Sequence, residues 1–244
     1  MDQETYLKVM EQQHACVCIA PTEVNKEVDK LLTVMGLDVE PEQVPVRPEE
    51  YCKLLGCYYN VAEKVKRDGG KIHYGWAIWQ SHYLCQSEHH AVWEDDNENL
   101  IDITPREKPT DFIMFVPDNE VLYKEKPIAR IQINTTKNPI VDHIIYGHKV
   151  LDFLALYETR IDRDRAEVPA IVMEVVGLPD NPGMLRIVLA KREEFFLFGN
   201  KPTSKCYCGS DKQYSNCHGK FYKHEMAAYV QKITDEIGEP PKTL

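Results

Sequence analysis

The alternation of apolar and polar residues predicts β-strands in the first half of the chain. Across residues 72–79, large apolar side chains occupy every second position, as in a strand with one buried face. Gly75 within this strand indicates either a bulge or a close approach of two backbones. A second apolar run begins at His90 and a third contains Asp102, and turn-like residues at 95–99 separate them. We therefore expect these two runs to form a hairpin.

Other segments carry helix signals, continuous apolar runs or proline. Continuous apolar runs are typical of strands buried on both faces, and two such runs are joined by a loop at 179–183. The further strands predicted are 129–134, 168–178 and 184–190. The predicted helices are 2–18, a helix capped by Thr22 or Asn25 that Gly36 ends, 60–65, 139–161 with Pro139 in its first turn, and a last helix ending near Ile237. Proline marks a linker at 41–48 and an extended segment at 108–126.

Together these elements predict an α+β fold in which helices pack near an antiparallel sheet. We divide the chain into an α+β domain at 1–200, which begins with a helical segment, and a small module with the terminal helix at 201–238. The proline-containing end that follows Gly238 is expected to be a disordered tail at 239–244.

Composition narrows the classes of function. The 244 residues are 43% hydrophobic and 28% charged, which is ordinary for a globular protein. The net charge of −10 comes from 29 basic and 39 acidic residues, so we expect no DNA partner. There is no run of 18 apolar residues, and the acidic start Met1–Glu4 lacks the basic region of a signal peptide. We therefore expect no membrane span, a cytoplasmic location and no disulfide framework for the eight cysteines.

A cysteine, a histidine and a carboxylate occur in that order on three predicted elements. Cys57 lies at a helix start, where unpaired backbone N–H groups and the helix dipole favour a thiolate. His90 lies on a strand, and Asp102 lies on the next strand of the expected hairpin. A nucleophilic thiol needs this set, because a base forms the thiolate and a carboxylate orients the base. We predict Cys57, His90 and Asp102 as catalytic residues, with His89 as the alternative base.

This set of residues resembles the transglutaminase-like branch of the papain-like cysteine enzymes. That family places a cysteine at a helix start, a histidine on a strand and an aspartate on the following strand. The matching segments are Gly56-Cys57-Tyr58, His90-Ala91-Val92-Trp93 and Leu100-Ile101-Asp102-Ile103-Thr104-Pro105. The resemblance covers about residues 50–106 and implies a papain-like core. The family's aromatic residue follows the histidine by two positions, whereas Trp93 follows His90 by three, which keeps His89 as a candidate.

A second chemical motif lies near the end of the chain. Cys206 and Cys208 flank one residue, and the adjacent pair Cys217 and His218 follows after eight more residues. Three thiolates and one imidazole complete a tetrahedral set for Zn²⁺. Because four protein ligands leave no open position, we predict one structural Zn²⁺ per chain rather than a catalytic metal.

This second motif closely resembles the SEC-C motif, a zinc-binding tail first known from the SecA preprotein translocase. Cys206, Cys208, Cys217 and His218 match its ligand positions, and the resemblance covers about residues 203–221. In that family the module contacts protein partners, including a secretion chaperone, and sometimes the ribosome. The resemblance therefore implies a partner-binding appendage.

The combined expectation is a cysteine-dependent amide hydrolase or acyl transferase. The oxyanion would be held by the Cys57 backbone N–H, with the Asn60 side chain as a candidate second donor. An acidic chain with a partner-binding tail favours a protein or peptide substrate. The alternative is a non-catalytic adaptor that binds a protein or ribosomal partner through the zinc module. An enzyme acting on peptidoglycan is a third candidate, which the missing export signal disfavours.

Overall fold

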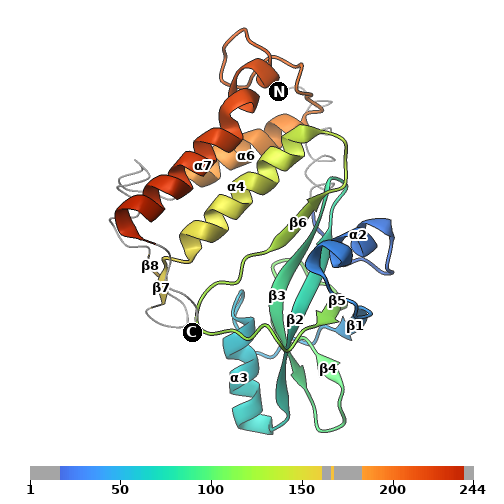
Figure 1. Ribbon diagram of the computed structural model, residues 1–244. Coiled ribbons are helices and arrows are strands. Elements are labelled where there is room, and N and C mark those ends of the chain that lie inside the picture. Colours follow the sequence, from blue (N-terminus) through green and yellow to red (C-terminus); the bar gives the residue numbers. More distant parts are fainter. Residues whose placement is uncertain (1–16, 161–165, 168–182, 239–244) are drawn as a thin grey trace. The chain divides into compact units, whose positions relative to one another are not determined.

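The computed structural model describes residues 17–160, 166–167 and 183–238 (Figure 1). The chain forms two compact units by its internal contacts. The first, here called the sheet unit, consists of Cys18–Gln80 and Cys85–Gln132. The second, here called the helical unit, consists of Val17, Ser81–Leu84 and the described residues from Ile133 onward. The expected domain at 1–200 therefore includes residues of both units, and the change from one unit to the other falls near Ile133.

An antiparallel sheet dominates the sheet unit, so the α+β class predicted from the sequence is confirmed (Figure 1). The strand order is β1-β5-β2-β3-β4, and β6 also pairs with β3. The strands are β1 (Glu42–Pro45), β2 (Lys71–Gln80), β3 (Leu84–Glu94), β4 (Leu100–Ile101), β5 (Phe112–Pro117) and β6 (Ile131–Asn134). The predicted hairpin is present, because β3 and β4 pair antiparallel with Trp93 opposite Ile101.

The chain segments that follow the two edge strands, β1 and β4, meet at Asp102. A parallel bridge joins Val46, just after β1, to Asp102, just after β4. The Asp102 N–H donates to the Pro45 carbonyl oxygen at 3.0 Å, and the Arg47 N–H donates to the Asp102 carbonyl oxygen at 2.8 Å. The backbone of a predicted catalytic residue is thus fixed by hydrogen bonds in both directions.

The register of β2 and β3 separates the two adjacent histidines. Gly75 lies opposite His90 and Trp76 lies opposite His89. Since neighbouring residues of a strand point to opposite faces, His89 and His90 lie on different sides of the sheet. Of the two interpretations of Gly75, the structure shows the close approach of two backbones. A Cβ atom there would lie 2.3 Å from the Val116 carbonyl oxygen.

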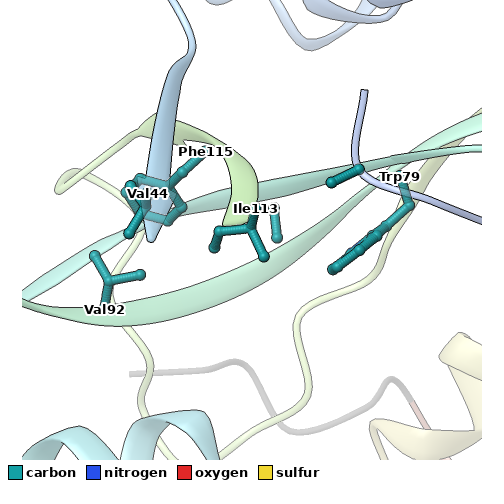
Figure 2. Packing of buried hydrophobic residues seen from close by; sticks show 7 residues of the cluster. Val44, Trp79, Val92, Ile113 and Phe115 are labelled. Carbon is teal, nitrogen blue, oxygen red and sulfur yellow. The ribbon is translucent and has the colours of Figure 1, made fainter. Parts of the chain in front are cut away.

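Each face of the sheet has its own hydrophobic packing. One cluster joins residues of β1, β2, β3 and β5, including Val44, Trp79, Val92, Ile113 and Phe115 (Figure 2). On the other face, Val61 of helix α3 (Cys57–Asp68) packs with Ala91 and Ile103. This packing holds the start of α3 near the strand that carries His90.

Helix α2 (Lys26–Met35) follows its sequence signals closely. The Asn25 side chain accepts hydrogen bonds from the backbone N–H groups of Glu27 and Val28, which makes it the cap among the two candidates. Gly36 ends the helix in the left-handed region at φ 70°.

Three helices form the core of the helical unit and lie side by side in Figure 1. They bury one cluster that contains Leu154, Leu189, Tyr222 and Ile233. The elements of this unit are α4 (Pro139–Ala155), β7 (Thr159–Arg160), β8 (Ala166–Glu167), α6 (Gly183–Leu197), η1 (Tyr214–Asn216) and α7 (His218–Ile237). No helix in the described ranges is long and apolar enough to cross a membrane.

Several expected elements differ from those observed. The strand expected at 184–190 is wrong, because these residues belong to α6. Leu189, Arg192 and Phe195 are buried at helical spacing, so one side of this helix is buried. Strands β1 and β5 lie within the stretches expected to be a linker and an extended segment. The strand expected at 168–178 and residues 2–16 of the first expected helix lie outside the described residues.

Candidate functional site

Cys57 is the first residue of α3 and is 8% exposed. Among the described residues, no side chain caps this helix start, which follows Gly56. The backbone N–H groups of the first turn therefore remain available to an anion, and the helix dipole adds to their positive potential. Leu55, two residues before Cys57, has φ 59° and is 94% exposed, so an apolar side chain lies in solvent on a strained backbone close to the thiol.

His90 connects Cys57 to Asp102. Its Nε2 atom lies 3.1 Å from the Asp102 Oδ1 atom, and Cys57 is close enough to contribute to the raised pKa of His90. With Nε2 turned to the carboxylate, Nδ1 is the ring nitrogen left for the thiol. Burial alone would lower the pKa of His90, but the Asp102 carboxylate and Cys57 outweigh burial and raise this pKa to about 10. The protonated imidazolium is therefore the favoured form of His90.

Asp102 has no exposed surface, yet both of its carboxylate oxygens have donors. Oδ1 accepts from His90 and from the Thr104 backbone N–H at 3.0 Å. Oδ2 accepts from the Arg106 Nη2 atom at 2.7 Å. Burial opposes ionisation, but His90, Arg106 and the Thr104 N–H together lower the pKa of Asp102 to about 2. Asp102 is thus an anion held between two cations.

His89, the alternative base, has different partners. Its Nε2–H donates to the Val121 carbonyl oxygen at 2.7 Å, so its Nδ1 atom accepts from the Tyr58 hydroxyl at 3.0 Å. Burial lowers the pKa of His89 and keeps the ring neutral. Because both ring nitrogens are engaged, His89 has no free nitrogen to offer Cys57. The structure brings His90, and not His89, together with Cys57 and Asp102.

Two of the three residues, Cys57 and His90, line a cleft of about 440 Å³ in the sheet unit, and Asp102 lies buried behind them. Cys57 and His90 lie on its wall, and Trp79 supplies an aromatic surface beside them. Leu54 and Leu55 add apolar side chains on the helix α3 side. The charged residues on the wall, apart from the histidines, are Glu88, Arg106, Glu107 and Lys108. The thiol thus lies in a space with both apolar and charged walls.

Asn60 has a different role from the one expected. It is fully buried, and its Nδ2 group donates to the Lys53 carbonyl oxygen at 2.8 Å and to the Thr104 hydroxyl at 3.3 Å. Its Oδ1 atom accepts from the Lys53 backbone N–H at 3.0 Å. Both amide hydrogens are used inside the protein, so Asn60 fastens the loop before Cys57 to the segment after Asp102. It is not placed to donate to an oxyanion.

The four predicted metal ligands lie together in the helical unit. One ligand atom from each of Cys206, Cys208, Cys217 and His218 lies within 4.8 Å of all the others. The Cys206 Sγ atom is 3.2 Å from the His218 Nδ1 atom, and the Cys208 and Cys217 Sγ atoms are 3.7 Å apart. This cluster could hold a metal ion.

The cluster is anchored in the helical unit by Tyr214. This residue is 1% exposed and packs with Cys206, Ile144 and Phe195. Its hydroxyl hydrogen-bonds with the His143 Nδ1 atom at 2.8 Å. The ligand segment is therefore attached to α4 and α6 through one buried aromatic side chain.

Sequence reasoning missed Arg106. The available signal was its position four residues after Asp102, behind the turn-forming pair Thr104-Pro105. That spacing indicates an ion pair between Arg106 and Asp102 only when Asp102 is known to be buried.

Comparisons with protein-family models, with curated proteins and with solved structures found no match. The functional argument that follows therefore rests on the residues and their geometry.

Proposed function

We propose that the sheet unit is a cysteine-dependent amide hydrolase or acyl transferase with a papain-like, transglutaminase-like core. The observation that carries this proposal is the sequence of contacts from Cys57 through His90 to the buried Asp102, with Cys57 and His90 on the wall of a cleft. A buried thiol, imidazole and carboxylate in this order form a nucleophile, its base and the group that orients the base. The antiparallel sheet and the placement of Cys57 at a helix start also support it.

The proposed reaction follows from the order in which these residues contact one another. The Cys57 thiolate attacks the carbonyl carbon of an amide, and a carbon–sulfur bond forms as the carbonyl π electrons move onto oxygen. The His90 imidazolium donates its proton to the leaving nitrogen, and an amine departs from the acyl-thioester. Neutral His90 then accepts a proton from water or from a second amine, which attacks the thioester and regenerates the Cys57 thiolate.

The oxyanion of this step belongs at the start of α3. The backbone N–H groups of the first turn, that of Cys57 among them, would donate to the carbonyl oxygen as it becomes an oxyanion. The uncapped start of the helix supports this role, because its orphan donors would find their acceptor in the substrate. We propose a protein or peptide substrate, because a partner-binding tail suits a macromolecular substrate.

The test is the selective alkylation of Cys57. Protein as purified is treated with iodoacetamide at pH 6, and modified cysteines are mapped by mass spectrometry. We expect Cys57 to react at least tenfold faster than Cys52, a half-buried thiol of the same unit, because only Cys57 contacts an imidazolium. Cys57→Ala should remove the fast phase and Cys52→Ala should leave it intact. Equal labelling of both cysteines would instead favour the adaptor function.

We further propose that Cys206, Cys208, Cys217 and His218 bind one structural Zn²⁺. A tetrahedral zinc ion with Zn–S bonds of about 2.3 Å and a Zn–N bond of about 2.0–2.1 Å sets its ligand atoms about 3.5–3.8 Å apart. The separations of 3.7 Å between two sulfurs and 3.5 Å between Cys217 Sγ and His218 Nδ1 support this assignment, whereas Cys206 Sγ and His218 Nδ1 lie closer together, at 3.2 Å. With all four positions taken, the ion would order the module for binding a protein partner, as the SEC-C resemblance implies. Native mass spectrometry should find one zinc per chain, and Cys208→Ser should lose it.

A further inference from the structure

Arg106 makes more contacts at the candidate active site than a surface cation needs. Its Nη2 atom lies 2.7 Å from Asp102 Oδ2 and 3.5 Å from His90 Nε2. Its guanidinium lies over the Trp79 ring, 4.6 Å from the ring centroid. Its Nε–H is buried and has no hydrogen-bond partner among the described residues. An unsatisfied buried donor costs stability, so this arrangement is not the one that folding alone would favour.

The local sequence builds this geometry. The Thr104 N–H donates to the Asp102 side chain two residues earlier, which turns the chain back on itself. Pro105 then fixes the backbone direction, and Arg106 returns to the other oxygen of the same carboxylate. The Trp79 ring sets the plane of the guanidinium. Arg106 is thus held by the buried Asp102 carboxylate and by the Trp79 ring on the cleft wall.

The charges explain what Arg106 could do. The Asp102 carboxylate stabilises the His90 imidazolium. The same negative charge repels a Cys57 thiolate on the other side of the imidazole. With Arg106 also bound to Asp102, the group of His90, Asp102 and Arg106 carries one net positive charge. A thiolate facing that group is stabilised, whereas it would face a neutral pair if Arg106 were absent.

We propose that Arg106 is a positioning residue that neutralises Asp102, so that the charge of His90 is left to the Cys57 thiolate. This inference rests on the proposed function of Cys57. It predicts that Arg106 acts on the fraction of thiolate and not on the intrinsic nucleophilicity of the sulfur. The other charged groups on the cleft wall are Glu88, Glu107 and Lys108. Within the described residues, none of them forms a hydrogen bond or ion pair with Asp102.

The experiment measures the rate of Cys57 alkylation by iodoacetamide from pH 5 to pH 9.5 in four proteins. These are the wild type, Arg106→Met, Arg106→Lys and the matched control Lys108→Met, which removes a cation from the same cleft. Arg106→Met should react about tenfold more slowly at pH 6, with the midpoint of its rate profile about one pH unit higher. Its rate should equal that of the wild type at pH 9.5, where the thiolate forms without help.

The remaining variants and the wild type separate the possible outcomes. Arg106→Lys should restore part of the rate at pH 6, and Lys108→Met should change it less than twofold. An unchanged profile in Arg106→Met, with fast wild-type labelling, would overturn the role of Arg106 and leave the proposed function standing. Slow, unselective labelling of the wild type would defeat the proposed function itself. If Arg106→Met does not fold by circular dichroism, Arg106→Gln replaces it, since it keeps a polar side chain of similar reach.

Discussion

Cysteine and histidine meet in both units of this protein, but in opposite arrangements. In the sheet unit one thiol meets one imidazole, and a buried carboxylate holds the imidazole from behind. In the helical unit three thiols meet one imidazole, with all four ligand atoms within 4.8 Å of one another. A single thiol beside an imidazolium has electrons to donate to a substrate. Three thiols around one imidazole offer their electrons to a cation and keep none free.

The two arrangements also differ in how the chain assembles them. The four candidate ligands of the helical unit lie between Cys206 and His218, so a turn and a helix start bring them together. Cys57, His90 and Asp102 come from a helix, a strand and the segment after a strand. One site therefore depends on local chain geometry and the other on the closed sheet. Breaking one should leave the chemistry of the other intact.

The largest expected effect is the loss of metal from the helical unit. A strong chelator, or Cys208→Ser, should lower the free energy of unfolding of this unit by several kcal/mol, because structural zinc contributes much of the folding energy of such modules. Thermal unfolding followed by circular dichroism measures the loss. Cys57 should still be alkylated at the wild-type rate, and Cys52→Ser should retain the metal. A parallel loss of Cys57 reactivity would show that the two sites are coupled.

The next effect separates the two histidines of β3. His90→Ala should reduce any turnover that depends on Cys57 by about 10²–10⁴-fold, because the base and proton donor is removed. His89→Ala should leave turnover largely intact but lower the free energy of unfolding by about 1–3 kcal/mol, because Tyr58 and Val121 lose a buried partner. Kinetic assays and urea unfolding of both variants give the two numbers. Inactivation by the His89 change would contradict the register of β2 and β3.

The smallest effect is the acid dependence contributed by Asp102. Its folded pKa of about 2 lies below the ordinary 3.8, so the ionised carboxylate adds about 2 kcal/mol to the free energy of unfolding above about pH 5. This contribution is lost as the pH falls through 2. The stability difference between wild type and Asp102→Asn should therefore shrink between pH 5 and pH 2, as measured by urea unfolding. Asp96→Asn, at an exposed turn position, should keep the wild-type slope.

Much of the sheet unit could be predicted because its signals are local. Asn25 and Gly36 mark the ends of α2, and turn residues between two apolar runs predict the hairpin that carries His90 toward Asp102. Strand β5 could not be predicted in the same way. Its apolar run lies among prolines, and its central place between β1 and β2 arises from pairings distant in sequence.

The candidate sites show the same division. The Cys/His cluster of the helical unit could be predicted from spacing, because Cys-x-Cys and an adjacent Cys-His pair are complete within one short segment. For the sheet unit, the sequence predicted Cys57, His90 and Asp102 but left His89 as a rival. Only the pairing register and the partners of each ring distinguish the two histidines. Arg106 could not be predicted, because its role depends on a carboxylate buried by the closure of the sheet.

That closure has a consequence for how the chain folds. The bridge between Val46 and Asp102 joins residues far apart in sequence, and such contacts are slow to form because a long loop must first be closed. His90 can be on its hairpin and Cys57 on its helix before Asp102 is locked in place. The reactivity of Cys57 should therefore mature in step with the last long-range pairing of the sheet. During refolding, a partly folded chain should lack the fast alkylation of Cys57. The time at which fast alkylation appears would therefore measure when the fold is complete.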